Sequence, residues 1–223
     1  INKLKKAFEW FAWENGFDHG KDPETGEKVY LTRNKTAANK LEKAGKKYIY
    51  ISDPGNQKLP TARRSAFINS VVYNSFNNNI IATFFHEGAV FSINKQTGKA
   101  EKVLSGLKSP HGGMQLSKDE YLATSTAHGE VVAGNSNYET RFLFKNLSGK
   151  PPELNDMEWI QNSKMFKDNI ISIDSNRNSF VIFNPEKKLM EETFNTEILK
   201  GKRLRGNDMG KAILGYSYLE KDK

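Results

Sequence analysis

The chain has 223 residues, 37% hydrophobic and 27% charged, which indicates a globular protein that can bury a sizeable core. It has no cysteine, which excludes disulfides, thiolate metal sites and cysteine nucleophiles. Lys and Arg number 34 against 26 Asp and Glu, and the net charge of +8 favours anionic partners such as nucleic acid or acidic glycans. A lysine-rich surface that only maintains solubility explains the same charge.

The chain contains no apolar run near the roughly 18 residues that a membrane span needs, so we expect no transmembrane segment. The first residues also lack the pattern of a secretory signal peptide. Because the chain begins at Ile1 rather than Met, we expect a processed form or a fragment of a longer protein.

Residues 1–45 are predicted to form a helical segment that packs on the main body. A first amphipathic helix is expected to end near Gly16, because apolar residues recur at helical spacing before it. Its apolar stripe consists of Leu4, Ala7, Phe8, Phe11 and Ala12. A second short helix is expected from Thr36 through Leu41, with Thr36 as its N-cap and a stop at Gly45.

From residue 46 onward, short β-branched and aromatic runs alternate with turn residues. The expected strands are residues 48–51, 80–85, 89–93, 121–126, 130–133, 170–173 and 179–183. Strands at such intervals indicate a sandwich, a barrel or a propeller.

An internal repeat favours the propeller. Four similar tripeptides, spaced by 43, 43 and 52 residues, are taken as the starts of innermost strands: Asn69-Ser70-Val71, Gly112-Gly113-Met114, Asn155-Asp156-Met157 and Asn207-Asp208-Met209. A period near 40–45 residues with four strands per unit is typical of propeller blades. We therefore predict an all-β fold, a β-propeller of four-stranded blades over residues 46–223, with a short helical N-terminal segment. The last blade is expected to be incomplete or closed by other residues.

One stretch resembles a known blade signature. Ser109-Pro110-His111-Gly112-Gly113, followed by the apolar strand, small turn and valine-rich strand of residues 121–131, resembles the blades of NHL-type and gluconolactonase-like propellers. Residues 48–58 are similar to the second half of that signature. The resemblance implies an architecture, and it leaves the function open because common folds carry unrelated activities.

In a propeller, the loops that lead into the innermost strands surround one mouth of the central channel. The repeat places these residues there: Asn69, His111, Asn155, Asp156, Arg205, Asn207 and Asp208. Resemblance to gluconolactonase-like enzymes implies Ca²⁺ or Mg²⁺ held by Asn155, Asn207 and Asp208, since amide and carboxylate oxygens suit these cations.

Under that hypothesis His111 and Asp208 are the catalytic residues, with His111 as general acid or base. The ligand-binding residues are then Asn69, Asp156 and Arg205. No glutamate occupies the matching position of the first blade, and turn chemistry alone explains the same Asn and Asp residues.

The remaining polar residues point to no further catalytic set. His86 and His128 fall in turns after second strands, whereas His111 starts a blade, so a shared four-histidine centre is not expected. Asp174 ends a strand and is either a channel acid or a structural residue that bonds the following turn. Trp159 is expected in the core. The chain has no P-loop, dinucleotide fingerprint, zincin motif or nucleophile elbow.

Three functions stay open. The first, favoured because no clear catalytic set is present, is a binding module that presents its channel mouth to a protein, peptide or glycan. The second is a cation-dependent hydrolase or lyase, which stabilisation by metal would favour. The third is an accessory domain of a nucleic-acid-associated assembly, which an affinity that falls steeply with salt would favour.

Overall fold

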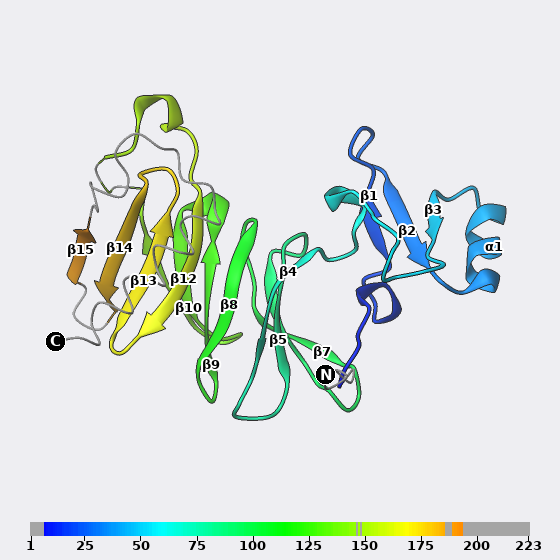
Figure 1. Ribbon diagram of the computed structural model, residues 1–223, viewed down its shortest axis with the longest axis horizontal. Coiled ribbons are helices and arrows are strands. Elements are labelled where there is room, and N and C mark those ends of the chain that lie inside the picture. The colour runs from blue at the N-terminus through cyan, green and yellow to red at the C-terminus, as the bar shows by residue number, and fades with distance from the viewer. Residues whose placement is uncertain (1–6, 146, 148, 186–188, 194–223) are drawn as a thin grey trace, which may run out of the picture. The chain divides into compact units, whose positions relative to one another are not determined.

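The computed structural model describes residues 7–145, 147, 149–185 and 189–193. The chain divides into two compact units, Ile1–Ser105 and Gly106–Lys223, and each is described by itself. The described residues are mostly β-structure in four-stranded antiparallel sheets, with one α-helix (Figure 1). None of the helices in these residues is long and apolar enough to cross a membrane.

Unit 1 begins with a small three-stranded sheet in the order β1-β2-β3. β1 is antiparallel to β2, whereas β3 is parallel to β2 because the helix α1 connects them. The elements are β1 (His19–Lys21), β2 (Lys28–Thr32), α1 (Lys35–Lys43) and β3 (Tyr48–Tyr50). Residues on both sides of position 45 therefore contribute to one layer.

The prediction of a first helix is wrong for residues 7–11, which form no helix, and only a short 3₁₀ turn, η1 (Ala12–Glu14), follows. The apolar side chains of this segment pack separately onto the aromatic core around Phe84, as Trp10 does with ring centroids 5.8 Å apart. Tertiary packing thus explains their burial without a helix.

The second helix is confirmed, but its N-cap is Asn34 rather than Thr36. The Asn34 side chain accepts a hydrogen bond from the backbone N–H of Ala37, which satisfies one of the free donors of the first turn. The helix stops two residues before Gly45, which has φ +64°.

Unit 1 also contains a four-stranded antiparallel sheet in which each strand pairs with the next along the chain. Its strands are β4 (Ile68–Tyr73), β5 (Ile80–Phe84), β6 (Ala89–Ile93) and β7 (Ala100–Leu104). Phe84, Phe91 and Phe17 meet in its core, with Phe84 fully buried.

Unit 2 contains two sheets of the same kind. The first has β8 (Pro110–Ser117), β9 (Glu120–Ser125), β10 (Glu130–Gly134) and β11 (Glu139–Leu143). The second has β12 (Ile160–Phe166), β13 (Asn169–Asp174), β14 (Ser179–Asn184) and β15 (Leu189–Thr193). β12 packs against β8 and β9, and buried side chains such as Leu122 and Ile160 form one core between the sheets.

These three sheets confirm the four-stranded units, and six of the predicted strands lie in them within a residue or two. The seventh, residues 48–51, is β3 of the three-stranded sheet and belongs to no four-stranded unit. The first strands of the three sheets begin at Ile68, Pro110 and Ile160, so the third unit starts later than expected. Asn155-Asp156-Met157 does not start a strand, because a long loop with the turn η4 (Pro152–Leu154) precedes β12. No closed ring of blades is seen in the described part of the chain, and Asn207-Asp208-Met209 lies outside it.

Candidate functional site

A hollow of about 640 Å³ opens in unit 2 between the loop before β12 and the turn between β13 and β14. Figure 1 shows that this loop and this turn lie at the same end of the sheet. The lining residues are Pro151, Glu153, Leu154, Met157, Trp159, Ser175, Asn176 and Asn178. The volume lies within the usual range of small-ligand sites.

Much of the wall is apolar. Met157 is 44% exposed, an unusual exposure for a large hydrophobic side chain beside a hollow. Trp159 is half-buried, and its indole N–H donates to Oε1 of Gln161 at 2.9 Å. Its ring also meets the His111 ring edge-on, with centroids 6.2 Å apart. These contacts hold the indole in place and leave part of its surface in the hollow.

A lysine inside the loop holds the loop's own carbonyl groups. Nζ of Lys150 donates to the backbone oxygens of Asn155 at 2.9 Å and Met157 at 3.3 Å. The same ammonium pairs with Oε1 of Glu158 at 2.6 Å, and both side chains are largely buried. Because all three donors of the ammonium are used, Lys150 stabilises one loop conformation.

A second buried cation connects this loop to the β13–β14 turn. The Arg177 side chain is fully buried, and its Nη1 donates to Oδ2 of Asp174 at 2.7 Å. Its Nε and Nη2 donate to the backbone oxygen of Leu147 at 3.2 and 3.0 Å. Oε2 of Glu158 lies 3.7 Å from Nη1 of the guanidinium. The two carboxylates, Asp174 and Glu158, therefore balance the charge of the two cations, Lys150 and Arg177.

Asp174 has the structural contacts that were one of the two roles expected for it. Its Oδ1 accepts hydrogen bonds from the backbone N–H groups of Asn176 and Arg177, at 3.0 and 3.2 Å, and so closes the turn. The side-chain amide of Asn176 then donates to the backbone oxygen of Met157 at 2.6 Å. The turn and the loop therefore hold each other, and the hollow between them is preformed.

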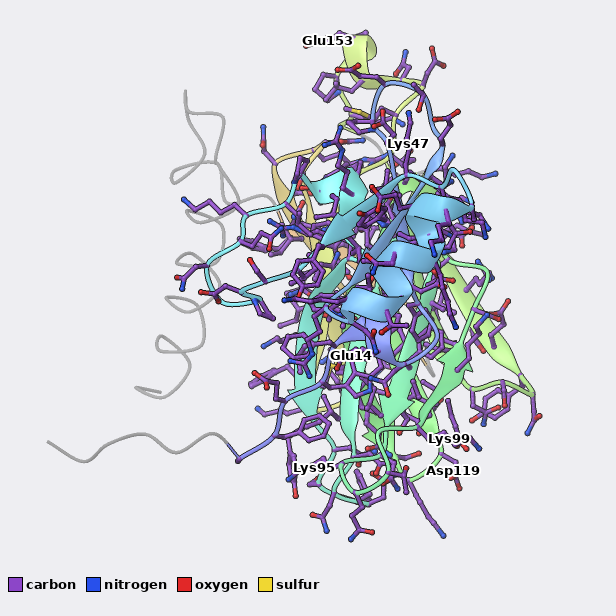
Figure 2. All side chains as sticks on the ribbon, turned by 90° about the vertical axis from the view of Figure 1, so that its right-hand side faces the viewer. Glu14, Lys47, Lys95, Lys99, Asp119 and Glu153 are labelled. Atoms are coloured by element: carbon purple, nitrogen blue, oxygen red, sulfur yellow. The ribbon has the colours of Figure 1, made fainter. Side chains whose placement is uncertain are left out.

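The electrostatic character of the hollow is simple. Glu153 is the one charged residue among those that line it, and Lys150 and Arg177 direct their charge into the network behind the wall. Figure 2 shows Glu153 at the tip of the short helical turn η4. The hollow thus combines apolar surface, a few neutral polar groups and one carboxylate at its rim.

The described residues that the sequence placed at one mouth belong to both units, and their convergence stays a prediction. Asn69 lies in β4 of unit 1, and His111 lies at the start of β8 in unit 2. Asn155 and Asp156 are exposed on the loop, outside the lining of the hollow. The three remaining predicted residues, Arg205, Asn207 and Asp208, lie outside the described residues.

A divalent-cation site stays a prediction. Within the described ranges no group of three or more His, Asp or Glu side chains is arranged to hold a metal ion. The proposed ligands Asn207 and Asp208 are beyond those ranges, so the geometry does not test the ligand set.

His111 sits in a half-buried, polar setting. Its Nδ1 lies 2.7 Å from Oγ1 of Thr126 and 3.1 Å from the backbone oxygen of Ser109. Burial lowers the pKa of His111 below its ordinary value, and the Ser109 contact opposes that change more weakly. The imidazole is therefore mostly neutral at neutral pH. A catalytic role for it stays a prediction.

Sequence reasoning missed the residues that shape the hollow. Lys150, Glu158 and Arg177 follow no recognisable motif, and the contacts of Arg177 with Glu158 and Leu147 depend on the tertiary fold. The nearest local signal is the acid–base pair Asp174 and Arg177, three residues apart across a turn. Trp159, expected in the core, is a wall of the hollow instead.

The chain matches no protein-family model and no curated protein. Among solved structures it is similar to a streptogramin B lyase, with 11% identity over 66% of this chain and 44% of that one and a TM-score of 0.48. A virginiamycin B lyase from Staphylococcus aureus gives 12% identity over 66% and 45% of the two chains, with a TM-score of 0.46.

The extracellular domain of a one-component system from B. thetaiotaomicron gives 18% identity over 67% and 18% of the chains, with a TM-score of 0.43. The chain thus spans less than half the length of these proteins. Scores of this size carry no inference about fold or activity, and the NHL-type and gluconolactonase-like resemblance stays a prediction.

Proposed function

We propose that this chain is a propeller-type binding module that receives an apolar side chain of a peptide or protein partner in the hollow beside Trp159. The observation that carries the proposal is the partly apolar hollow kept open by a buried ionic network. Lys150 and Arg177 together hold three backbone carbonyls of the loop, from Leu147, Asn155 and Met157.

A preformed site lowers the entropy cost of binding, because the loop is ordered before the partner arrives. Three contacts order the wall: the Lys150 ammonium, the Arg177 guanidinium and the Asn176 amide. Each donates to a backbone oxygen of the loop, so the loop has little freedom left to lose.

The lining favours a peptide over an anionic polymer. Leu154, Met157 and Trp159 offer apolar and polarisable surface, and methionine adapts to side chains of different shape. The only charged lining residue is the acid Glu153, which disfavours the phosphates of a nucleic acid or the carboxylates of an acidic glycan. The cation-dependent enzyme and the nucleic-acid assembly remain alternatives that no described side chain of the hollow favours.

The test is calorimetric titration with acetylated, amidated pentapeptides that carry Phe, Met or Ser at the centre. Burying an apolar side chain contributes about 1.5–3 kcal/mol. We therefore expect the Phe and Met peptides to bind about tenfold to a hundredfold more tightly than the Ser peptide.

Met157→Asp places a second carboxylate in the wall and is expected to weaken the Phe peptide at least tenfold. Leu143→Asp is the matched control, since Leu143 is 46% exposed in the same unit and does not line the hollow. Equal affinity for all three peptides, or equal loss in both variants, would refute the proposal.

A further inference from the structure

Unit 1 contains a second hollow, of about 380 Å³, that the binding function of unit 2 does not involve. It lies between η1 and the segment of residues 51–64, which includes the turn η2 (Thr61–Arg63). Apolar groups of Trp13, Ile51, Pro54 and Leu59 line it, together with the basic residues Lys58 and Arg64. Its volume is near the lower end for small-ligand sites.

The aromatic wall of this second hollow is held in place. The Trp13 ring stacks on the Phe11 ring, with centroids 4.7 Å apart and an interplanar angle of 25°. Ile51, at the base, is 2% exposed. A rigid apolar floor of this kind takes a hydrocarbon or aromatic body without having to reorder.

The loop opposite Trp13 is also fixed by its own side chains. The Gln57 amide donates to the backbone oxygen of Tyr50 at 3.1 Å, and its oxygen accepts from the N–H of Ser52 at 3.1 Å. Both ends of this amide are therefore occupied, and they fasten the loop to the end of β3. The lining residues Lys58 and Leu59 come directly after Gln57, so these hydrogen bonds also hold the chain where their segment begins.

The guanidinium of Arg64 is positioned but not neutralised. Its Nε donates to the backbone oxygen of Leu59 at 3.1 Å, and its carbon lies over the Phe67 ring, 5.6 Å from the centroid. No described residue pairs with its two terminal nitrogens. These nitrogens form the planar fork that binds a carboxylate in a bidentate manner.

No acid offsets these cations at the hollow. The one acid in residues 51–64 is Asp53, which is not a lining residue. Its carboxylate accepts from the Asn56 side chain and from the backbone N–H of Gly55, and these hydrogen bonds lower the pKa of Asp53. The carboxylate is therefore committed to its own turn, and Lys58 and Arg64 set the charge of the rim.

We propose that this second hollow binds a small carboxylic acid with an apolar body, whose carboxylate pairs with Arg64 while its body lies against Trp13 and Leu59. The apolar floor selects the body, and the unpaired guanidinium selects the anion. This site shares no residue with the hollow of unit 2, because all of its lining residues belong to unit 1.

The test uses three probes with the same phenylalkyl body on the full chain: 3-phenylpropionate, 3-phenylpropionamide, which has the same shape as the acid, and 3-phenylpropylamine, which carries a cation instead. Titration calorimetry is expected to show binding of the acid, affinity for the amide about tenfold lower, and no binding of the amine, since hydrogen bonds to a charged group are the stronger ones. Equal affinity for acid and amide, or no binding of the acid at 10 mM, would overturn the proposal.

Arg64→Gln is expected to weaken the acid about tenfold and to leave the amide unchanged. Lys95→Gln removes one positive charge from unit 1 at a side chain that lies over Tyr73, away from the hollow, and is expected to change neither. If Arg64→Gln disturbs folding, Lys58→Gln gives a second test, with a smaller selective loss for the acid. If Arg64→Gln and Lys58→Gln weaken binding of the acid no more than Lys95→Gln does, the proposed site is also wrong.

Discussion

The buried ionic network behind the unit 2 hollow makes a sharp stability prediction. Arg177→Met removes the guanidinium but keeps much of its apolar length. It leaves Asp174, which is fully buried, without the partner of its Oδ2, and Glu158 loses its second cation. Removing one partner of a buried pair typically costs about 3–5 kcal/mol. We expect a loss of that size in the free energy of unfolding.

Urea unfolding followed by circular dichroism measures this loss. At a slope of about 2 kcal/mol/M the midpoint of unit 2 is expected to fall by about 2 M. Arg141→Met is the control, since Arg141 forms ion pairs with Glu130 and Glu139 at a partly exposed position and is expected to cost within about 1 kcal/mol.

The double variant Arg177→Met with Asp174→Asn distinguishes network loss from general damage. Replacing both partners is expected to cost less than the sum of the single replacements, because no unpaired charge remains at Asp174. The reasoning is refuted if Arg177→Met costs no more than Arg141→Met, or if the two losses at Arg177 and Asp174 simply add.

Three further predictions concern single positions. Burial lowers the folded-state pKa of His111, so the unfolded chain binds that proton more tightly. The contribution of His111 to stability is therefore full above about pH 6.5 and is lost as the pH falls below it. His111→Asn should reduce this loss, which is measured as the difference between the urea midpoints at pH 7.5 and pH 5.5. Gly20→Ala should destabilise unit 1 by about 1–3 kcal/mol in urea unfolding, because its Cβ would overlap the backbone carbonyl of Arg63, which no side-chain rotation relieves. Phe84→Ala should lower the free energy of unfolding by about 3–5 kcal/mol in the same assay, since Phe84 is fully buried among aromatic rings. A loss below about 1 kcal/mol in Gly20→Ala or in Phe84→Ala would contradict the packing described here.

The four-stranded sheets could be predicted because their hairpins have strong local signals, whereas the three-stranded sheet of unit 1 was not expected. The run 80–85 and the run 89–93 are β-branched and aromatic, and a turn with Gly88 separates them. In such hairpins both strands and their connection lie within one short segment, so local sequence determines them. The same holds for β13 and β14, where Asp174 closes the turn.

The failures have a common physical cause. The spacing of Phe8 and Phe11 fits a helix, but side chains of this segment pack separately on a neighbouring sheet, a long-range contact with no local signal. Asn155-Asp156 repeats the Asn207-Asp208 pair, yet here it belongs to a loop whose carbonyl groups Lys150 and Arg177 hold. Tertiary contacts override local pattern in both cases.

The candidate site could be predicted only in outline. Loop ends before innermost strands were expected to carry function, and the hollow lies beside such a loop. The lining residues Met157 and Trp159 come together with Asn178 only after β12, β13 and β14 have paired. Residues brought together from separate strands in this way share no sequence spacing, so no motif could identify them.

The most direct test of the account uses Trp159 as its own reporter. In a chain with Trp10→Phe and Trp13→Phe, Trp159 is the sole tryptophan, and it forms part of the hollow wall. Titration with the pentapeptide that has Phe at its centre is predicted to give a saturable change in Trp159 fluorescence, and Met157→Asp is predicted to move the midpoint of that change to at least tenfold higher peptide concentration. Absence of any saturable change, or an unchanged titration in the Met157→Asp chain, would contradict binding in this hollow.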